Sequence, residues 1–224
     1  MAASDNAPRR ALLAGASGLI GRALLAQLLA DDRYGHVDVV ARRPLAGAET
    51  RHPKLTVMSG DMAALVAGGP VADDAYIALG TTIAVAGSEA AFRAVDFDLV
   101  VAIARAARAA GTRRLGVVSA LGADPRSRVF YNRVKGEMEA ALRVLGYDTL
   151  AIARPSLLVG DRAALGQPVR RAEVWATRLL GPVMRLVPAG VRPIEASAVA
   201  AALRTALGAG EAGVRILTSA TMQR

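Results

Sequence analysis

RALLAGASGLIG, residues 10–21, is the stretch that decides the fold expected of this chain. Its apolar first half predicts a buried strand, and four leucines beyond it recur on one face of a helix: Leu24, Leu25, Leu28 and Leu29. Three glycines separate the strand from the helix: Gly15, Gly18 and Gly21. Glycines at these places allow a tight turn and let the backbone and the helix N-terminus approach a pyrophosphate. The stretch therefore predicts a dinucleotide site, with an ordinary glycine-rich turn as the alternative, because the G-x-x-G-x-x-G spacing is not the most familiar one.

Composition predicts one soluble globular domain over residues 1–224, of which residues 1–8 are expected to fray. With 53% hydrophobic residues the chain can bury one sizeable core, whereas two full domains would be cramped. It has no cysteine, which excludes disulfides and thiolate metal sites and fits a reducing compartment, so we expect a cytoplasmic location. The histidines, His36 and His52, belong to no metal-ligand pattern, so no metal is expected.

The net charge of +9 raises the question of a nucleic-acid partner. Of the 28 basic residues 26 are arginine, and they are spread from Arg9 to Arg224 instead of forming one block. A general preference for arginine explains this pattern, so no nucleic acid is expected. A basic patch for nucleic acid or an acidic membrane is the alternative.

The N-terminal residues also resemble a targeting signal. Arg9 and Arg10 precede an apolar stretch, as in a twin-arginine or secretory signal. Cleavage of such a signal would remove the predicted first strand and glycine turn, so we expect the segment to be retained. No uncharged apolar run reaches the length of about 18 residues that a membrane span needs.

Apolar runs bounded by glycine or proline predict the remaining strands, over residues 37–40, 55–58, 75–79, 115–118, 149–153 and 214–218. Between them lie expected helices over 89–110, with Phe92, Val95, Leu99 and Ile103 inward, and over 130–145, with Val134, Met138, Leu142 and Leu145 inward. Alternating strands and helices are typical of a parallel sheet covered on both faces. The fold class expected is therefore α/β, a doubly wound (Rossmann) sheet in a single domain.

Beyond Pro155 the alternation becomes less regular. We expect a small C-terminal cap over about 161–213, including a helix over 170–180 that packs by the stripe containing Trp175. Contact of this basic helix with a membrane surface is the alternative. Ser197 is expected to cap the last helix, which continues through Leu207.

Arginines at the end of the second strand bear on the choice of cofactor. An acid there would bind the ribose 2'-hydroxyl of NAD, but this strand ends in Ala41-Arg42-Arg43. Arg42 and Arg43, with Arg22 after the third glycine, suit a 2'-phosphate, so NADP(H) is expected. Three solvated arginines in an arginine-rich chain are the alternative.

The most informative catalytic motif is Tyr131-Asn132-Arg133-Val134-Lys135, in a chain with only four tyrosines and two lysines. A spacing of four places Tyr131 and Lys135 one turn apart on the same helix face. A phenol normally ionises near pH 10, so a neighbouring ammonium would help it to exchange a proton at neutral pH. Ser119, at the end of the fifth strand, is placed to donate a hydrogen bond to a substrate oxygen, with an ordinary turn serine as the alternative.

Together these motifs resemble the short-chain dehydrogenase/reductase superfamily over about residues 10–161. The segments LGTT (79–82), SALGA (119–123), YNRVKGE (131–137) and RPS (154–156) are most similar to its atypical and extended branches, and more narrowly to the atypical subgroup named for the Tat-interacting-protein oxidoreductase. The resemblance implies that Tyr131 is the general acid/base, Lys135 its activator and ribose ligand, and Ser119 the substrate orienter. The residues expected to contact the cofactor are Gly15, Ser17, Gly18, Leu19, Ile20, Gly21, Arg22, Arg42, Arg43, Asp61, Met62, Leu79, Gly80, Thr81, Thr82, Lys135, Pro155, Ser156, Leu157 and Leu158.

One residue departs from that pattern. Many superfamily members have Val-Asn in the helix that corresponds to residues 89–110, where the asparagine helps to hold a proton-relay water, but this chain has Val95-Asp96. A carboxylate beside an inward stripe needs a partner or a water. Asp96 either replaces the asparagine or marks a weaker catalyst.

The function expected is NADPH-dependent hydride transfer to or from a carbonyl or alcohol of a small molecule, by a monomer or homodimer. A binding protein that uses NADPH as a signal or structural ligand to regulate or assemble a partner is the first alternative. A nucleic-acid-binding protein, whose affinity would fall steeply with salt, is the second. The sequence beyond Gly160 contains no pattern that identifies a substrate.

Overall fold

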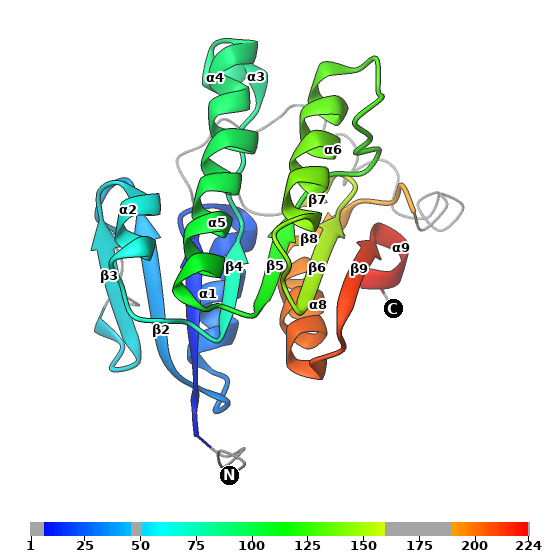
Figure 1. Cartoon of the computed structure of the whole chain (residues 1–224). Helices are drawn as coiled ribbons and strands as arrows, with labels where there is room; N and C mark the ends of the chain where they lie inside the picture. The colour runs from blue at the N-terminus through cyan, green and yellow to red at the C-terminus, as the bar shows by residue number, and fades with distance from the viewer. Residues whose placement is uncertain (1–6, 46–50, 160–189, 224) are drawn as a thin grey trace.

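Seven parallel strands form the main sheet in the computed structural model, which describes residues 7–45, 51–159 and 190–223. Their order is β3-β2-β1-β4-β5-β6-β9 (Figure 1). The strands are β1 (Arg9–Ala14), β2 (Tyr34–Ala41), β3 (Leu55–Ser59), β4 (Asp74–Ile77), β5 (Arg114–Val118), β6 (Thr149–Arg154) and β9 (Gly213–Thr218). A separate short pair joins β7 (Leu158–Val159) to β8 (Ile194–Glu195). The strand order reverses between β1 and β4, so the predicted doubly wound Rossmann fold is confirmed.

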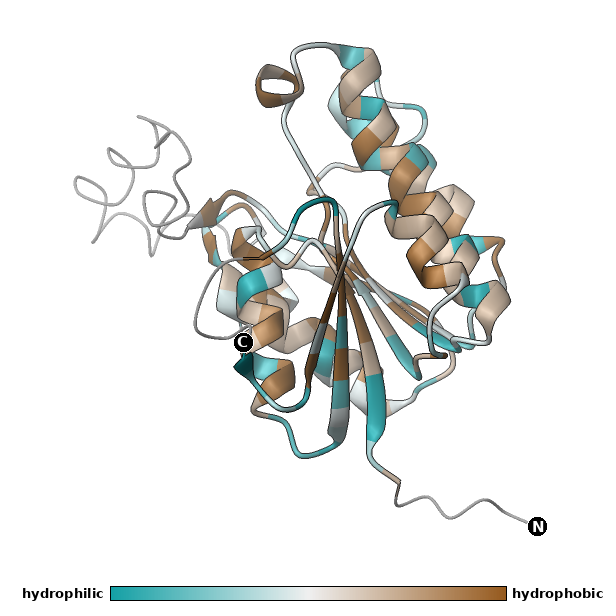
Figure 2. Ribbon diagram, turned by 90° about the vertical axis from the view of Figure 1, so that its left-hand side faces the viewer, coloured by the Kyte–Doolittle hydropathy of each residue, from teal (hydrophilic) through white to brown (hydrophobic). Residues whose placement is uncertain are grey.

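Helices cover both faces of the sheet, which Figure 2 shows nearly edge-on. One apolar layer packs α1 and α8 against the sheet, and the layer on the other face contains α2, α5 and α6. The helical segments are α1 (Leu19–Leu29), α2 (Met62–Ala67), α3 (Ile83–Ala86), α4 (Glu89–Arg93), the π-helical η2 (Ala94–Leu99), α5 (Val100–Ala110), α6 (Phe130–Arg143), α8 (Ala196–Ala209) and α9 (Ser219–Met222). No helix among the described residues is long and apolar enough to span a bilayer.

A short helix, α2, follows β3, where the sequence analysis predicted no helix. Asp61 precedes it, and its Oδ1 accepts hydrogen bonds from the backbone N–H groups of Ala63 at 3.0 Å and Ala64 at 3.2 Å. These bonds satisfy two amide groups that a helix N-terminus otherwise leaves free. An N-cap therefore starts a helix too short to be recognised from hydrophobic periodicity.

The helix predicted over 89–110 is present, but its segment η2 is π-helical. In η2 the wider turn changes which side chains face the core. Asp96 and Val100 are fully buried, whereas Val95 and Leu99, which were predicted to point inward, are only half-buried. The π turn therefore places a carboxylate on the inner face of the helix, where the regular period predicted apolar residues.

The C-terminal prediction is only partly testable, because residues 160–189, including the helix expected over 170–180, lie outside the described residues. The prediction of a cap is wrong for α8, which shares a core layer with α1. Ser197 is not the N-cap, since α8 begins at Ala196 and Glu195 holds the cap position, without a side-chain hydrogen bond to the first amide groups of the helix. Ser197 instead donates to a carboxylate oxygen of Glu195 at 3.2 Å.

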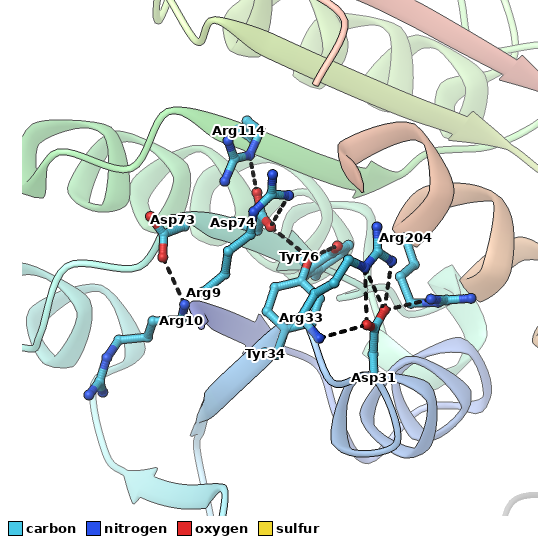
Figure 3. Close-up of polar contacts among 10 residues, drawn as sticks. All are labelled: Arg9, Arg10, Asp31, Arg33, Tyr34, Asp73, Asp74, Tyr76, Arg114 and Arg204. Atoms are coloured by element: carbon cyan, nitrogen blue, oxygen red, sulfur yellow. Dashed lines mark hydrogen bonds and ion pairs between the residues drawn. The ribbon is translucent and has the colours of Figure 1, made fainter. Parts of the chain in front are cut away.

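Polar residues tie together the N-terminal ends of four strands (Figure 3). The glycine turn lies at the opposite end of β1. The Tyr34 hydroxyl donates to Asp74 at 2.6 Å, so the Tyr76 hydroxyl, 2.8 Å away, donates to Tyr34. Asp74 is fully buried and also binds Arg114, with Arg9 3.7 Å away. Burial raises the pKa of Tyr34 and of Tyr76 well above its usual value. We call these five residues the strand-start cluster.

A second ion-pair group, centred on Asp31, lies beside the strand-start cluster (Figure 3). Its carboxylate accepts hydrogen bonds from Arg33 and, at 2.6 Å, from Arg204 of α8. The bond from Arg33 is the main reason that the pKa of Asp31 falls well below its usual value. This pairing joins the loop after α1 to α8, and so supports the layer that the two helices share.

Candidate cofactor and catalytic site

The turn after β1 is closed tightly enough to require glycine at two positions. Gly15 has a φ of +94°, and a Cβ on it would lie 2.6 Å from the carbonyl carbon of Ala78. A Cβ on Gly21 would lie 1.9 Å from the carbonyl oxygen of Gly15. The first turn of α1 therefore packs directly on the end of β1, as the prediction of a dinucleotide site requires.

The N-terminus of α1 offers backbone donors to an anion. Gly18 holds the cap position, has no side chain to bond the first amide groups, and is followed by no acidic residue in the first turn. The loop after β4 lies alongside, because the Ala78 amide donates to the Ala14 carbonyl at 2.8 Å. These two loops flank the place where the strand order reverses, so the residues fit a dinucleotide whose pyrophosphate meets the helix N-terminus.

The three arginines expected to bind a 2'-phosphate are all exposed: Arg22, Arg42 and Arg43. Arg42 and Arg43 directly follow the last residue of β2, and Arg22 lies in the first turn of α1. None of the three forms an ion pair with a residue in the described part of the chain. Their guanidinium groups therefore remain available for a ligand phosphate.

On one face of α6, three side chains at successive turns contact other elements of the fold: Tyr131, Lys135 and Glu139. The Tyr131 ring packs on Phe92 of α4, with 5.2 Å between ring centroids. The Lys135 ammonium lies 2.7 Å from Oδ1 of Asp96 in η2. Glu139 binds groups from β6 and the loop that follows β5. We call this set the α6 stripe.

Asp96 has the partner that its burial requires. Besides pairing with Lys135, it accepts a hydrogen bond at 2.9 Å from the Thr81 amide in the loop after β4. Asp96 is 0% exposed and Lys135 2%, so the ion pair is removed from water. The carboxylate thus links the lysine of the predicted catalytic pair to a loop predicted to hold the cofactor.

Ser119 lies where its strand was predicted to end, but its hydroxyl faces a carboxylate. It donates to Oε1 of Glu139 at 2.6 Å, and both residues are buried. Arg154 donates to the same carboxylate through Nε at 2.9 Å and Nη2 at 2.6 Å. Sequence reasoning missed Glu139, although it continues the four-residue spacing of Tyr131 and Lys135.

Asp61 and Ser156, which were assigned to the cofactor, also have structural partners. Asp61 caps α2 through one oxygen, as described above. The Ser156 hydroxyl donates to the Arg192 carbonyl and lies 2.8 Å from the Ser219 hydroxyl of α9. Pro155 is buried, whereas Leu157 is 39% exposed. The cofactor contacts of this loop remain predictions.

Comparison with known proteins identifies relatives over most of the chain. The model of a family described as NAD(P)H-binding matches residues 15–162. Protein fmp52, mitochondrial, from Aspergillus fumigatus is 35% identical over 204 residues, which cover 88% of this chain and 85% of that protein. Protein HTATIP2 from Rattus norvegicus is 34% identical over 170 residues, covering 75% and 68%.

Solved structures support the fold. The Bordetella bronchiseptica enzyme WbmG in complex with NAD superposes with a TM-score of 0.70 at 18% sequence identity. The match covers 96% of this chain and 74% of that one. At this identity the likeness extends to the fold alone.

The relatives overturn the predicted location. Proteins named fmp52 from several fungi are described as mitochondrial, which contradicts the expectation of a cytoplasmic protein. That expectation depended on the absence of cysteine. A lack of cysteine fits any reducing compartment, so it does not distinguish the cytosol from others.

Proposed function

The chain belongs to the NAD(P)H-binding family, in the HTATIP2-like subgroup of the atypical short-chain dehydrogenases/reductases, and on this premise we propose that it is an NADPH-dependent oxidoreductase. Its substrate would be a small molecule with a carbonyl or alcohol group. The observation that carries the proposal is the α6 stripe, in which Tyr131 and the buried Lys135 lie one turn apart. The glycine turn supports the cofactor assignment independently.

Cofactor binding and proton transfer would be carried out by different groups of the chain. The amide groups at the start of α1 bind the pyrophosphate, and Arg22, Arg42 and Arg43 bind the 2'-phosphate. When bound, the cofactor supplies or accepts the hydride. The Tyr131 hydroxyl gives a proton to the substrate oxygen or takes one from it.

Lys135 and Asp96 support that proton transfer. The Lys135 ammonium stabilises negative charge on the phenol oxygen, because it is held in a site from which water is excluded. Asp96 fixes the ammonium at 2.7 Å and keeps it from turning toward solvent. This assigns to Asp96 a positioning role in place of the asparagine that many superfamily members have.

Replacement of Tyr131 by phenylalanine tests the proposal. The ring stays packed on Phe92, and only the hydroxyl is lost. We expect NADPH affinity to be retained while turnover of carbonyl compounds falls by about 10²- to 10⁴-fold. Equal turnover by wild type and Tyr131→Phe would refute the catalytic assignment.

One observation favours a second function, that of a catalytically weak NADPH-binding protein which regulates or assembles a partner. The Ser119 hydroxyl, expected to polarise a substrate carbonyl, donates to Glu139. This alternative predicts tight NADPH binding with no turnover on a broad panel of aldehydes, ketones and quinones. Turnover that depends on Tyr131 would exclude it.

A further inference from the structure

The hydrogen bond between Ser119 and Glu139 has a fixed polarity. Glu139 accepts two bonds from the Arg154 guanidinium in addition to the one from Ser119. An ionised carboxylate can only accept hydrogen bonds, so the serine must be the donor. The Ser119 proton therefore points toward Glu139.

The surroundings keep this arrangement in place. Ser119 is 4% exposed and Glu139 2%, so the bond between them is shielded from bulk water. The bond to Glu139 raises the pKa of Arg154 above its usual value, which keeps the guanidinium charged beside the carboxylate. Hydrogen bonds to an ionised group are roughly twice as strong as neutral ones. Turning the serine proton toward a neutral substrate would exchange a strong bond for a weaker one.

We propose that Glu139 is a positioning residue that makes Ser119 a hydrogen-bond acceptor toward the substrate, so that the site binds an alcohol in preference to the matching carbonyl compound. This inference rests on the proposed function, because it assumes that the substrate meets Ser119 at the carboxyl edge of the sheet. There the serine oxygen keeps two lone pairs. An alcohol O–H can donate to them, whereas a carbonyl oxygen would face them with lone pairs of its own.

The preference has an expected size. A carbonyl compound either forgoes the bond to Ser119 or forces its proton away from Glu139. From the difference between charged and neutral hydrogen bonds we expect the alcohol to bind about tenfold more tightly than its ketone. The hydroxyl of Tyr131 is able to donate to both ligands, so it does not cancel the difference.

A matched pair of ligands measures this preference without turnover. We would determine the dissociation constants of 1-phenylethanol and acetophenone by ligand-observed NMR titration. The full chain would be saturated with 1,4,5,6-tetrahydro-NADP, a reduced analogue that transfers no hydride. Because the two ligands share one skeleton, the ratio of their constants is insensitive to a general loosening of the pocket.

A double-mutant cycle shows whether Glu139 acts through Ser119. We expect both Ser119→Ala and Glu139→Gln to bring the ratio close to one. Glu139→Gln should have no further effect in the Ser119→Ala background. Glu137→Gln is the matched control, since Glu137 lies on α6 and forms a half-buried ion pair with Arg93, and it should leave the ratio unchanged.

A second variant is needed in case Glu139→Gln does not fold, because this substitution leaves Arg154 without its counter-ion. Glu139→Gln combined with Arg154→Met removes both charges together, which proteins tolerate better. The expected ratio is again close to one.

Three results would overturn the inference. The wild-type protein could bind the alcohol and the ketone with equal affinity, or bind neither of them. The third is a change in the ratio caused by Glu139→Gln that is equally large in the wild-type and Ser119→Ala backgrounds. Failure of the proposed function gives a different result, namely no binding of NADPH or of its analogue. In that case the ratio is measured on the cofactor-free protein and still decides the role of Glu139.

Discussion

The Lys135 ammonium and the Asp96 carboxylate form a buried ion pair, with 2.7 Å between Nζ and Oδ1. The lysine comes from α6 and the aspartate from the π-helical segment η2. Burial removes both charges from water, so each depends on the other for its stability. The pair is therefore a structural contact and, in the proposed function, also the support of Tyr131.

Removal of the Asp96 carboxylate should destabilise the protein strongly. Asp96→Ala leaves the Lys135 ammonium buried without a counter-ion, which we expect to lower the free energy of unfolding by about 3–5 kcal/mol. Asp96→Asn keeps an oxygen for the Thr81 amide and should cost less. Urea unfolding at neutral pH measures both changes, and Asp98→Asn, on the exposed side of the same segment, is the control with an effect within about 0.5 kcal/mol. A similar loss for Asp96 and Asp98 variants would contradict the role of the buried pair.

The proposed preference for NADPH over NADH should depend on Arg42 and Arg43. Replacing both with alanine removes charge-assisted hydrogen bonds to the 2'-phosphate, so we expect NADPH affinity to fall by about 10- to 100-fold while NADH affinity stays the same. Nucleotide fluorescence titration with both cofactors measures the effect. Arg113→Ala, at the opposite end of the sheet, controls for the general loss of positive charge. Similar affinity for both cofactors before and after the change would refute the 2'-phosphate assignment.

The glycine turn should tolerate a methyl group at one position and not at another. A Cβ on Gly21 would overlap the Gly15 carbonyl oxygen at 1.9 Å, so Gly21→Ala must push α1 away from β1. We expect this variant to lose NADPH binding and much of its stability. At Gly18 the nearest atom to an added Cβ is 3.5 Å away, an ordinary contact, so Gly18→Ala should fold normally. Thermal unfolding with and without NADPH compares the two, and equal behaviour would argue against the close packing of α1.

Buried tyrosines should make the protein sensitive to alkali. Burial raises the pKa of Tyr34 in the folded protein, whereas an unfolded tyrosine loses its proton near pH 10. The folded state therefore binds more protons above about pH 10, and the free energy of unfolding falls as the pH rises further. Tyr34→Phe should lower stability by about 1.5–3 kcal/mol at neutral pH, because Asp74 loses a donor, and should make the alkaline fall shallower. Urea midpoints near pH 8 and above pH 10 test this, and an unchanged slope would show that Tyr34 does not titrate as described.

The strands were predictable from the sequence because each central strand is buried on both faces. Buried parallel strands consist of continuous apolar runs, such as residues 115–118, and glycine or arginine marks their ends. That Tyr131 and Lys135 lie on the same face of a helix was predictable as well, because residues four apart on a helix share a face through helix geometry alone. The resemblance to the atypical reductase subgroup, confirmed by the relatives, depended on these local patterns.

The remaining features depend on contacts between distant segments. No local sequence pattern indicates that residues 94–99 form a π-helix, so the inward position of Asp96 was only partly expected. Ser119 and Glu139 are 20 residues apart in the chain, and which partner a hydroxyl finds is decided when β5 packs against α6. α2 was missed because a six-residue helix has too few turns to show periodicity.

The α6 stripe also determines which kinds of sequence change this protein can accept. Tyr131, Lys135 and Glu139 are aligned only because four residues span about one helical turn. Deleting one residue between Tyr131 and Lys135 would rotate the two parts of the helix by about 100° relative to each other, so they could no longer reach Phe92, Asp96 and Ser119 together. Single substitutions can therefore adjust each contact separately, but insertions and deletions within α6 would disrupt the whole set at once.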